Sequence, residues 1–270
     1  MGYQNIEFKV SDKIATIALN TPKNFNAFTE ELLADLGNIL DQCADDEGIR
    51  VLVICGEGRS FCSGGDVDTM RRSIENRNTQ SLIRIVRSAG NIARKIRAIR
   101  KPVIASLHGV VASDACSLAL LCDFRVASDD VLFMETFMNI GLVPDMGYTY
   151  VLSRYIGFGR LTEFLMTSKM FTADMALDMG MLNILTTREN LSNETMAYAK
   201  RLVALPQDTV ALTKALINQT LFSGLDACLD REAKYQDLLL RSENYIEGVE
   251  AFLEKRPAAF NKPLKEQVGR

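Results

Sequence analysis

The alternation of apolar and polar residues at the start of the chain predicts a β-hairpin. Residues 6–10 read Ile-Glu-Phe-Lys-Val and residues 14–19 read Ile-Ala-Thr-Ile-Ala-Leu, with a polar turn between them. Two continuous apolar runs, 51–55 and 103–107, have the length of strands that are buried on both faces. Loops of small residues follow both runs, and helical patterns come after them. This order predicts βα units and therefore an α/β fold.

The remaining pattern divides the chain into a mixed first part and a helical last part. Thr29 is expected to cap a helix with a core-facing leucine and isoleucine stripe. The polar segment 67–80 is interpreted as a mobile flap, and strands end by about residue 187. We therefore expect a core over 1–204 and a helical C-terminal region over 205–270. The other expected elements are helices at 82–99, 147–155, 159–167, 172–179, 189–204, 207–220, 224–240 and 243–254, and short strands at 124–127, 131–134 and 181–185.

Two loops of small residues are the first candidates for a functional site. Residues 59–66 read Arg-Ser-Phe-Cys-Ser-Gly-Gly-Asp, and residues 108–116 read His-Gly-Val-Val-Ala-Ser-Asp-Ala-Cys. Each loop follows a buried strand. Two such loops can direct backbone N–H groups at one point, which is the arrangement that stabilises a developing oxyanion.

Composition narrows the possible functions. The chain has 270 residues, of which 47% are apolar and 24% charged, and its net charge of −3 indicates neither a nucleic-acid groove nor a membrane surface. The only histidine is His108, so any histidine-based triad would need it. None of the six cysteines has C-x-x-C spacing, and no metal site is expected. No secretory signal or membrane-spanning stretch is evident, so a cytoplasmic location is expected.

The whole chain resembles the crotonase superfamily, which contains enoyl-CoA hydratases and isomerases. The resemblance implies a spiral of ββα turns, a C-terminal helical region used in trimerisation, and a homotrimer or hexamer. It also implies a coenzyme A thioester as substrate and no separate cofactor. The motifs that carry it are Asn-Phe-Asn-Ala-Phe at 24–28, Phe-Cys-Ser-Gly-Gly-Asp at 61–66, Lys-Pro-Val-Ile-Ala at 101–105, Leu-Ala-Leu-Leu-Cys-Asp at 118–123, Gly-Leu-Val-Pro at 141–144 and the tail at 251–257.

The resemblance assigns the oxyanion hole to two backbone groups, the N–H of Ser63 and the N–H of Asp114. Glycine is usual at the second position, so Asp114 is a departure from the family pattern. A carboxylate beside a nascent oxyanion would oppose the charge that the site should stabilise. Either the Asp114 side chain turns to a polar neighbour, or it has a specific role.

Both glutamates of the hydratases are missing. Their positions correspond to Ser117 and Phe137, neither of which can act as a carboxylate base, so efficient hydration is disfavoured. Asp145, which follows Pro144, resembles the catalytic carboxylate of isomerases in the family. Isomerisation needs only one such base. The competing interpretation of Asp145 is an N-cap of the following helix.

Other candidate residues have lesser roles. Glu135 is a possible displaced base, because period-two spacing on a strand would place it on the same face as Phe137. Asp66 is expected to cap the helix after the first loop, and His108 and Cys62 are interpreted as structural. By position in the family, the substrate contacts would be Lys23, Phe25, Ala27, Gly65, Asp66, Phe137, Leu142 and Lys255, with the two lysines meeting phosphates.

The sequence therefore predicts an acyl-CoA enzyme that moves a double bond from Δ3 to Δ2 through an enolate held in the oxyanion hole. One alternative is other enolate chemistry on CoA thioesters, such as weak hydration, decarboxylation or hydrolysis. The other is an acyl-CoA-binding protein that has lost catalysis.

Overall fold

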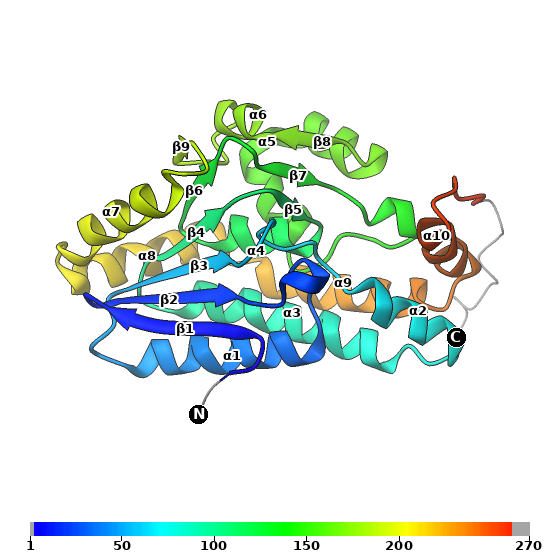
Figure 1. Cartoon of the computed structure of the whole chain (residues 1–270), viewed down its shortest axis with the longest axis horizontal. Coiled ribbons are helices and arrows are strands. Elements are labelled where there is room, and N and C mark those ends of the chain that lie inside the picture. Colours follow the sequence, from blue (N-terminus) through cyan, green and yellow to red (C-terminus); the bar gives the residue numbers. More distant parts are fainter. Residues whose placement is uncertain (1–2, 261–270) are drawn as a thin grey trace.

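The computed structural model describes residues 3–260, and a six-stranded sheet forms its centre (Figure 1). The first two strands pair antiparallel as the predicted hairpin, and every later pair in this sheet is parallel. The strand order is β1 (Ile6–Ser11), β2 (Ile14–Leu19), β3 (Val51–Gly56), β4 (Val103–Leu107), β6 (Phe124–Ser128) and β9 (Ile184–Thr186).

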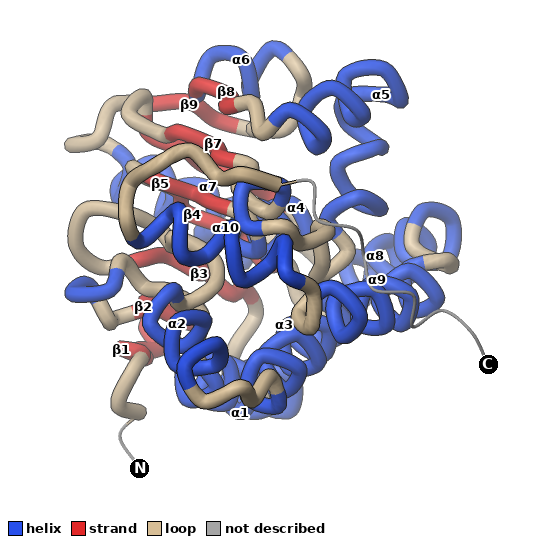
Figure 2. Tube along the Cα trace, turned by 90° about the vertical axis from the view of Figure 1, so that its right-hand side faces the viewer, coloured by secondary structure: helices blue, strands red, loops and turns tan. Residues whose placement is uncertain are grey.

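A second sheet of three short strands stands beside the first. It contains β5 (Val110–Ala112), β7 (Leu132–Met134) and β8 (Met170–Thr172), in that order. Figure 2 shows the strands of both sheets stacked from β1 at one end to β8 and β9 at the other. Strands β5 and β8 were not predicted, because β5 lies within the second small-residue loop and only the middle residue of β8 is buried.

Helices cover the sheets and form most of the C-terminal half. Helix α1 (Glu30–Asp45) begins at Thr29, whose side chain accepts the N–H of Leu32 as predicted, and it packs along α3 (Gln80–Ala98). The other helices are α2 (Val67–Glu75), α4 (Asp114–Leu121), α5 (Tyr148–Thr167), α6 (Ala173–Asp178), α7 (Leu191–Val203), α8 (Gln207–Leu221), α9 (Leu225–Leu239) and α10 (Glu243–Leu253), with 3-10 turns η1 (Pro22–Asn24) and η2 (Met138–Ile140).

The structure corrects two expectations about these elements. The segment expected to be a flap contains helix α2, which Asp66 caps by accepting the N–H of Thr69 at 2.9 Å. The strand predicted at 181–185 begins only at Ile184, because Met181 and Leu182 still belong to the connection that follows α6, where the N–H of Met181 donates to Ala176 O at 2.8 Å. The two helices predicted on either side of Gly157 are confirmed: α5 is interrupted at that glycine, whose dihedral angles are not helical (φ 72°, ψ 168°).

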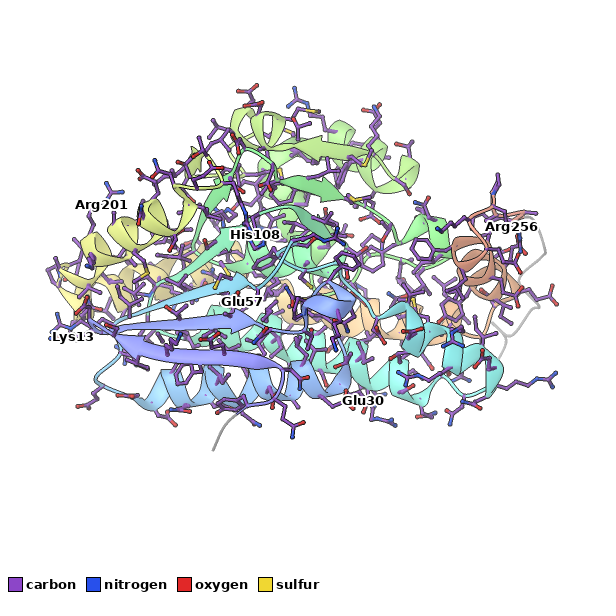
Figure 3. All side chains as sticks on the ribbon, in the orientation of Figure 1. Lys13, Glu30, Glu57, His108, Arg201 and Arg256 are labelled. Atoms are coloured by element: carbon purple, nitrogen blue, oxygen red, sulfur yellow. The ribbon has the colours of Figure 1, made fainter. Side chains whose placement is uncertain are left out.

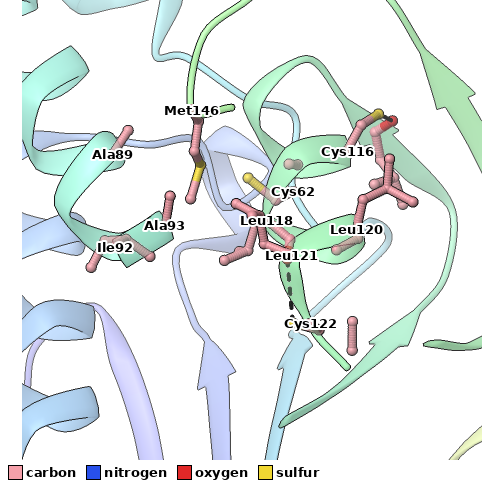
Figure 4. Close-up of a cluster of buried hydrophobic side chains, with 14 of the residues drawn as sticks. Cys62, Ala89, Ile92, Ala93, Cys116, Leu118, Leu120, Leu121, Cys122 and Met146 are labelled. Carbon is pink, nitrogen blue, oxygen red and sulfur yellow. Dashed lines mark hydrogen bonds between the residues drawn. The ribbon is translucent and has the colours of Figure 1, made fainter. Parts of the chain in front are cut away.

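Helix α4 lies at the centre of the core. All eight of its residues are buried, and side chains of other segments, among them Cys62, Ala93 and Met146, lie around it (Figure 4). Its N-terminus directly follows β5, so the fold places the first turn of a buried helix at the second small-residue loop. No helix in residues 3–260 is long and apolar enough to cross a membrane.

Candidate active site

The structure brings the two small-residue loops into direct contact. The N–H of Cys62 donates to Val110 O at 3.3 Å, and the N–H of Ala112 donates to Cys62 O at 3.1 Å. Gly64 has a φ of +82°, and a Cβ at this position would lie 2.8 Å from Ala112 O. Only glycine therefore allows the first loop to approach the second so closely.

The free N–H groups at this contact differ in part from those predicted. The N–H of Ser63 already donates to Phe25 O at 3.0 Å, so it is not available to a ligand. The N–H groups of Gly65 and Asp114 have no acceptor within residues 3–260. Asp114 is the first residue of α4, where backbone N–H groups lack partners within the helix. A Cβ on Gly65 would lie 4.0 Å from Asp114 Oδ2, so the two positions are neighbours.

Asp145 lies between η2 and α5, and its side chain faces the start of α4. It is only 3% exposed. Gln236 Nε2 donates to its Oδ2 at 2.9 Å, and Asp114 forms a second hydrogen bond with it through the two carboxyl groups. Its other oxygen, Oδ1, is buried without a partner. Burial raises the pKa of Asp145, and the two hydrogen bonds act in the opposite direction by favouring the ionised form.

The interpretation of Asp145 as an N-cap is wrong. Helix α5 begins after Gly147, which has left-handed dihedral angles, and no side chain caps it. Asp145 contributes only its backbone carbonyl, which accepts the N–H of Tyr148 at 3.0 Å. Its carboxylate is therefore not committed to the helix terminus.

Asp114 does not turn away from the site. Its carboxyl group is buried, its hydrogen-bond partner is the carboxyl of Asp145, and its Oδ1 has no partner. Burial first, and the nearby charge of Asp145 second, raise the pKa of Asp114 well above its ordinary value. The polar neighbour that was expected for the Asp114 side chain is thus Asp145, the candidate base.

Two residues of α9, Gln236 and Glu232, complete the surroundings of Asp145, and neither was predicted as a site residue. Gln236 also donates to Val143 O at 2.8 Å, while Glu232 accepts the N–H of Gly147 at 2.8 Å. Both side chains are buried. Buried polar residues four positions apart in an amphipathic helix were the available signal, but their partners lie about ninety residues away in the chain.

Glu135 has a different geometry from the one predicted. Strand β7 ends at Met134, and Phe137 has helical dihedral angles (φ −58°, ψ −46°), so period-two spacing does not apply. One carboxylate oxygen of Glu135 accepts the N–H of Phe137 at 2.8 Å, and the other is buried without a partner. Burial, together with the charge of Asp145, raises the pKa of Glu135 to about 8.

Apolar and sulfur-containing side chains form the rest of the site. Phe137, Leu142 and Met146, which flank Asp145 in the sequence, are buried in the main apolar core. Cys116 belongs to α4 and Cys62 lies on the first loop beside it (Figure 4); burial raises the pKa of each thiol, that of Cys116 to about 12. Neither cysteine is therefore a thiolate nucleophile at neutral pH.

The hydratase positions contain no base. Ser117 Oγ donates to Asp145 O at 3.4 Å, and Phe137 is an apolar wall. His108 lies inside the molecule, whereas the charged residues labelled in Figure 3 lie mostly toward its edges. Its Nε2–H donates to Gly58 O at 3.2 Å, and burial lowers its pKa to about 4. His108 is therefore a neutral structural residue at neutral pH, as the sequence indicated.

The residues predicted to contact coenzyme A differ in exposure. Phe25 is 42% exposed, with the guanidinium of Arg59 at 5.3 Å from its ring centroid, whereas Ala27 is buried. Lys23 and Lys255 are exposed. The Asp66 carboxylate is committed to α2, since it accepts both the N–H and the hydroxyl of Thr69.

Comparisons with known proteins agree with this architecture. The enoyl-CoA hydratase/isomerase family model matches residues 9–263. A trans-2-decenoyl-[acyl-carrier-protein] isomerase from Streptococcus mutans is 32% identical, covering 96% of this chain and 99% of the relative. A crotonyl-CoA hydratase from Syntrophomonas wolfei is also 32% identical, covering 96% and 99%. The crystal structure of an enoyl-CoA hydratase from Mycobacterium avium subsp. paratuberculosis superposes with a TM-score of 0.88 at 28% identity, covering 97% of this chain and all of the other.

Both isomerases and hydratases thus stand among the relatives, and the crotonase-like α/β fold expected from the motifs is confirmed. The chain belongs to the enoyl-CoA hydratase/isomerase family of acyl-CoA enzymes.

Proposed function

We propose that the protein moves the double bond of a 3-enoyl-CoA to the 2 position, with Asp145 as the acid–base residue. The observation that carries this proposal is the state of the Asp145 carboxylate. It is buried, which raises its pKa, yet its hydrogen bonds with Gln236 and Asp114 favour the ionised form. A carboxylate with a raised pKa whose ionised form is still supported by hydrogen bonds is a candidate general base.

The reaction follows from one base and one oxyanion hole. The thioester oxygen accepts hydrogen bonds from the N–H groups of Gly65 and Asp114. Asp145 removes a proton from C2, and the electron pair moves into a dienolate whose negative oxygen these donors stabilise. The protonated Asp145 then returns the proton to C4, which leaves the double bond between C2 and C3. No metal or cofactor takes part in this sequence of proton transfers.

Hydration is the less favoured outcome because it needs a water held by ionisable groups. Ser117 and Phe137 stand where the hydratase glutamates would be. Ser117 is not ionisable, and its Oγ donates to the backbone carbonyl of Asp145 and not to the carboxylate. The names of the relatives alone do not decide between the two reactions, so the support for isomerisation is this side-chain chemistry.

Substrate binding and assembly follow the family assignment. We place the phosphates of coenzyme A near Lys23 and Lys255, the adenine near the backbone of Phe25 and Ala27, and the acyl chain against Phe137 and Leu142. A trimer or hexamer would cover apolar side chains that α8 exposes, which are Leu212, Leu216, Ile217 and Leu221. Light scattering at several protein concentrations tests this assembly.

A substrate panel tests the reaction. The enzyme is mixed separately with a 3-enoyl-CoA, with the matching 2-enoyl-CoA and with the 3-enoyl thioester of acyl carrier protein. We expect the absorbance of the conjugated thioester to appear from the 3-enoyl substrate. Chromatography should detect no 3-hydroxyacyl product. Rapid formation of 3-hydroxyacyl-CoA from the 2-enoyl substrate would instead identify a hydratase.

A further inference from the structure

We propose that Asp114 works as a neutral carboxylic acid that shares a single proton with Asp145, so that the oxyanion hole borders a hydrogen-bond donor instead of a second negative charge. The catalytic consequence rests on the function proposed above. The sharing of the proton does not, because it follows from how the two side chains are placed.

Geometry sets the number of protons that the pair can hold. The two carboxyl groups are in contact, both are buried, and each has an Oδ1 without any other hydrogen-bond partner. Carboxylate oxygens without protons have no hydrogen to donate, so a hydrogen bond between two carboxyls requires a proton on one of them. Two buried carboxylates in contact would also repel strongly, which is why such pairs ionise one at a time.

The surrounding contacts place the proton on Asp114. Asp145 accepts the amide of Gln236 at 2.9 Å, a contact that favours its ionised form. Apart from Asp145, Asp114 has no side-chain hydrogen-bond partner, and its Oδ1 is unpaired. Asp114 is therefore the donor and Asp145 the acceptor.

The neighbouring titratable groups reinforce this assignment. The acids at the site are Asp114, Asp145, Glu135 and Glu232. No arginine, lysine or histidine of residues 3–260 forms a hydrogen bond or salt bridge with any of the four. The pKa shifts of Asp114 and Glu232 are both toward the protonated form, as a cluster of acids requires. Besides Asp145, the carboxyls of Glu135 after β7 and of Glu232 on α9 raise the pKa of Asp114. Asp114 in turn raises the pKa of the thiols of Cys62 on the first loop and Cys116 on α4. Tyr148 of α5 lies next to Cys116 and Glu135.

Asp114 then acts as a positioning residue for the base. Its backbone N–H belongs to the oxyanion hole, and its carboxyl lies beside Gly65, the other donor. A negative charge there would oppose the enolate, whereas a neutral acid does not. The same proton holds Asp145 in place and keeps it ionised. The aspartate at a position where the family has glycine is thus compatible with catalysis as long as it retains its proton.

A spectroscopic experiment tests the shared proton without any substrate. The full-length protein is labelled with 13C-carboxyl aspartate, and its infrared spectrum at neutral pH is compared with that of Asp114→Asn. We expect a 13C-shifted carboxylic-acid C=O band in the wild type that disappears in the variant. The aspartate label separates this band from those of Glu135 and Glu232. Absence of the band in the wild type, or its persistence in the variant, would overturn the proposal.

The pH profile of isomerisation tests the catalytic consequence. The wild type should lose activity at high pH, where Asp114 ionises, and Asp114→Asn should lack this alkaline limb. Asn can still donate to Asp145, so the acidic limb should stay in place. In Asp114→Ala the donor is lost, and the acidic limb should move upward by roughly one to two pH units. Identical limbs in all three proteins would contradict the role of Asp114. If none of the proteins isomerises 3-enoyl-CoA, the proposed function fails, and the infrared result decides the shared proton separately.

Discussion

At the residue scale, the site is a group of four buried acids whose surroundings give them different states. Burial raises the pKa of both Asp145 and Asp114, but the hydrogen bonds of Asp145 favour its ionised form, so our proposal assigns the shared proton to Asp114. Burial raises the pKa of Glu135 to about 8 and that of Glu232 to about 7. Because burial favours the protonated forms in such a cluster, the free energy of unfolding should fall as the pH rises. Surface salt bridges need ionised carboxylates and therefore have the opposite pH dependence.

Glu135 gives the clearest prediction of this kind. Between about pH 4.5 and about pH 8 the folded protein keeps the Glu135 proton, whereas the unfolded chain has lost it. The free energy of unfolding should therefore fall as the pH rises through this window, and Glu135→Gln should remove roughly 4 kcal/mol of that fall. Urea unfolding followed by circular dichroism at several pH values measures it. The exposed Glu31→Gln is the control and should follow the wild type; a Glu135→Gln curve parallel to the wild type would refute the prediction.

At the element scale, long periodic segments could be predicted from the sequence, and short ones only in part. The hairpin, α1, α3 and the helices of the last third follow from repeated apolar spacing, and the short strands β6 and β7 were also predicted. Strand β5 lies within the second small-residue loop and β8 has one buried residue, so these two strands are recognised only from their pairing with β7. The site shows the same division. Asp145 and the two loops were visible as motifs, but Gln236, Glu232 and the free N–H of Gly65 depend on contacts between distant segments.

The packing of α10 on η2 depends on two glycines. A Cβ on Gly248 would lie 2.6 Å from Ile140 Cα, and one on Gly141 would lie 2.8 Å from Asn244 O. These backbone contacts hold α10 against the turn that leads to Asp145.

Gly248→Ala should therefore destabilise the protein by about 1–3 kcal/mol, because the clash is with backbone and cannot be relieved by a rotamer change. Thermal unfolding followed by circular dichroism checks this. Gly159→Ala in α5 is the matched control, since nothing lies within 4 Å of that position and alanine favours helix. It should leave the melting temperature unchanged or raise it. Equal effects of the two substitutions would show that the close contact is unimportant.

At the scale of the whole molecule, one buried ionic network joins the C-terminal helices to the core. Asp123, after α4, bridges Arg97 of α3 at 2.9 Å and Lys214 of α8 at 2.7 Å, and it also accepts the N–H of Val103 at 2.8 Å. Arg97 and Lys214 are both buried. Asn218 of α8 adds hydrogen bonds to Arg97 in both directions. Helix α8 is thereby anchored to α3 and to Asp123, which follows α4.

Asp123→Asn should weaken the whole fold, since it leaves two buried cations without a counter-charge. We expect a loss of about 3–5 kcal/mol in the free energy of unfolding, measured by urea titration with circular dichroism because the chain has no tryptophan. Asp226→Asn removes the partner of an exposed pair with Arg94 and should change stability little. A small effect at Asp123 would show that the network does not anchor α8.

The central claim, that Asp145 transfers the proton, is tested most directly by following 3-enoyl-CoA in D2O with wild type and Asp145→Asn. Proton NMR reports both the rate and the position of deuterium in the product. The substitution keeps the shape of the side chain and its contact with Gln236, so the protein should fold and bind acyl-CoA normally. We predict that the wild type forms 2-enoyl-CoA and that the variant is slower by at least about a thousandfold. A variant that isomerises the substrate at the wild-type rate would contradict the account.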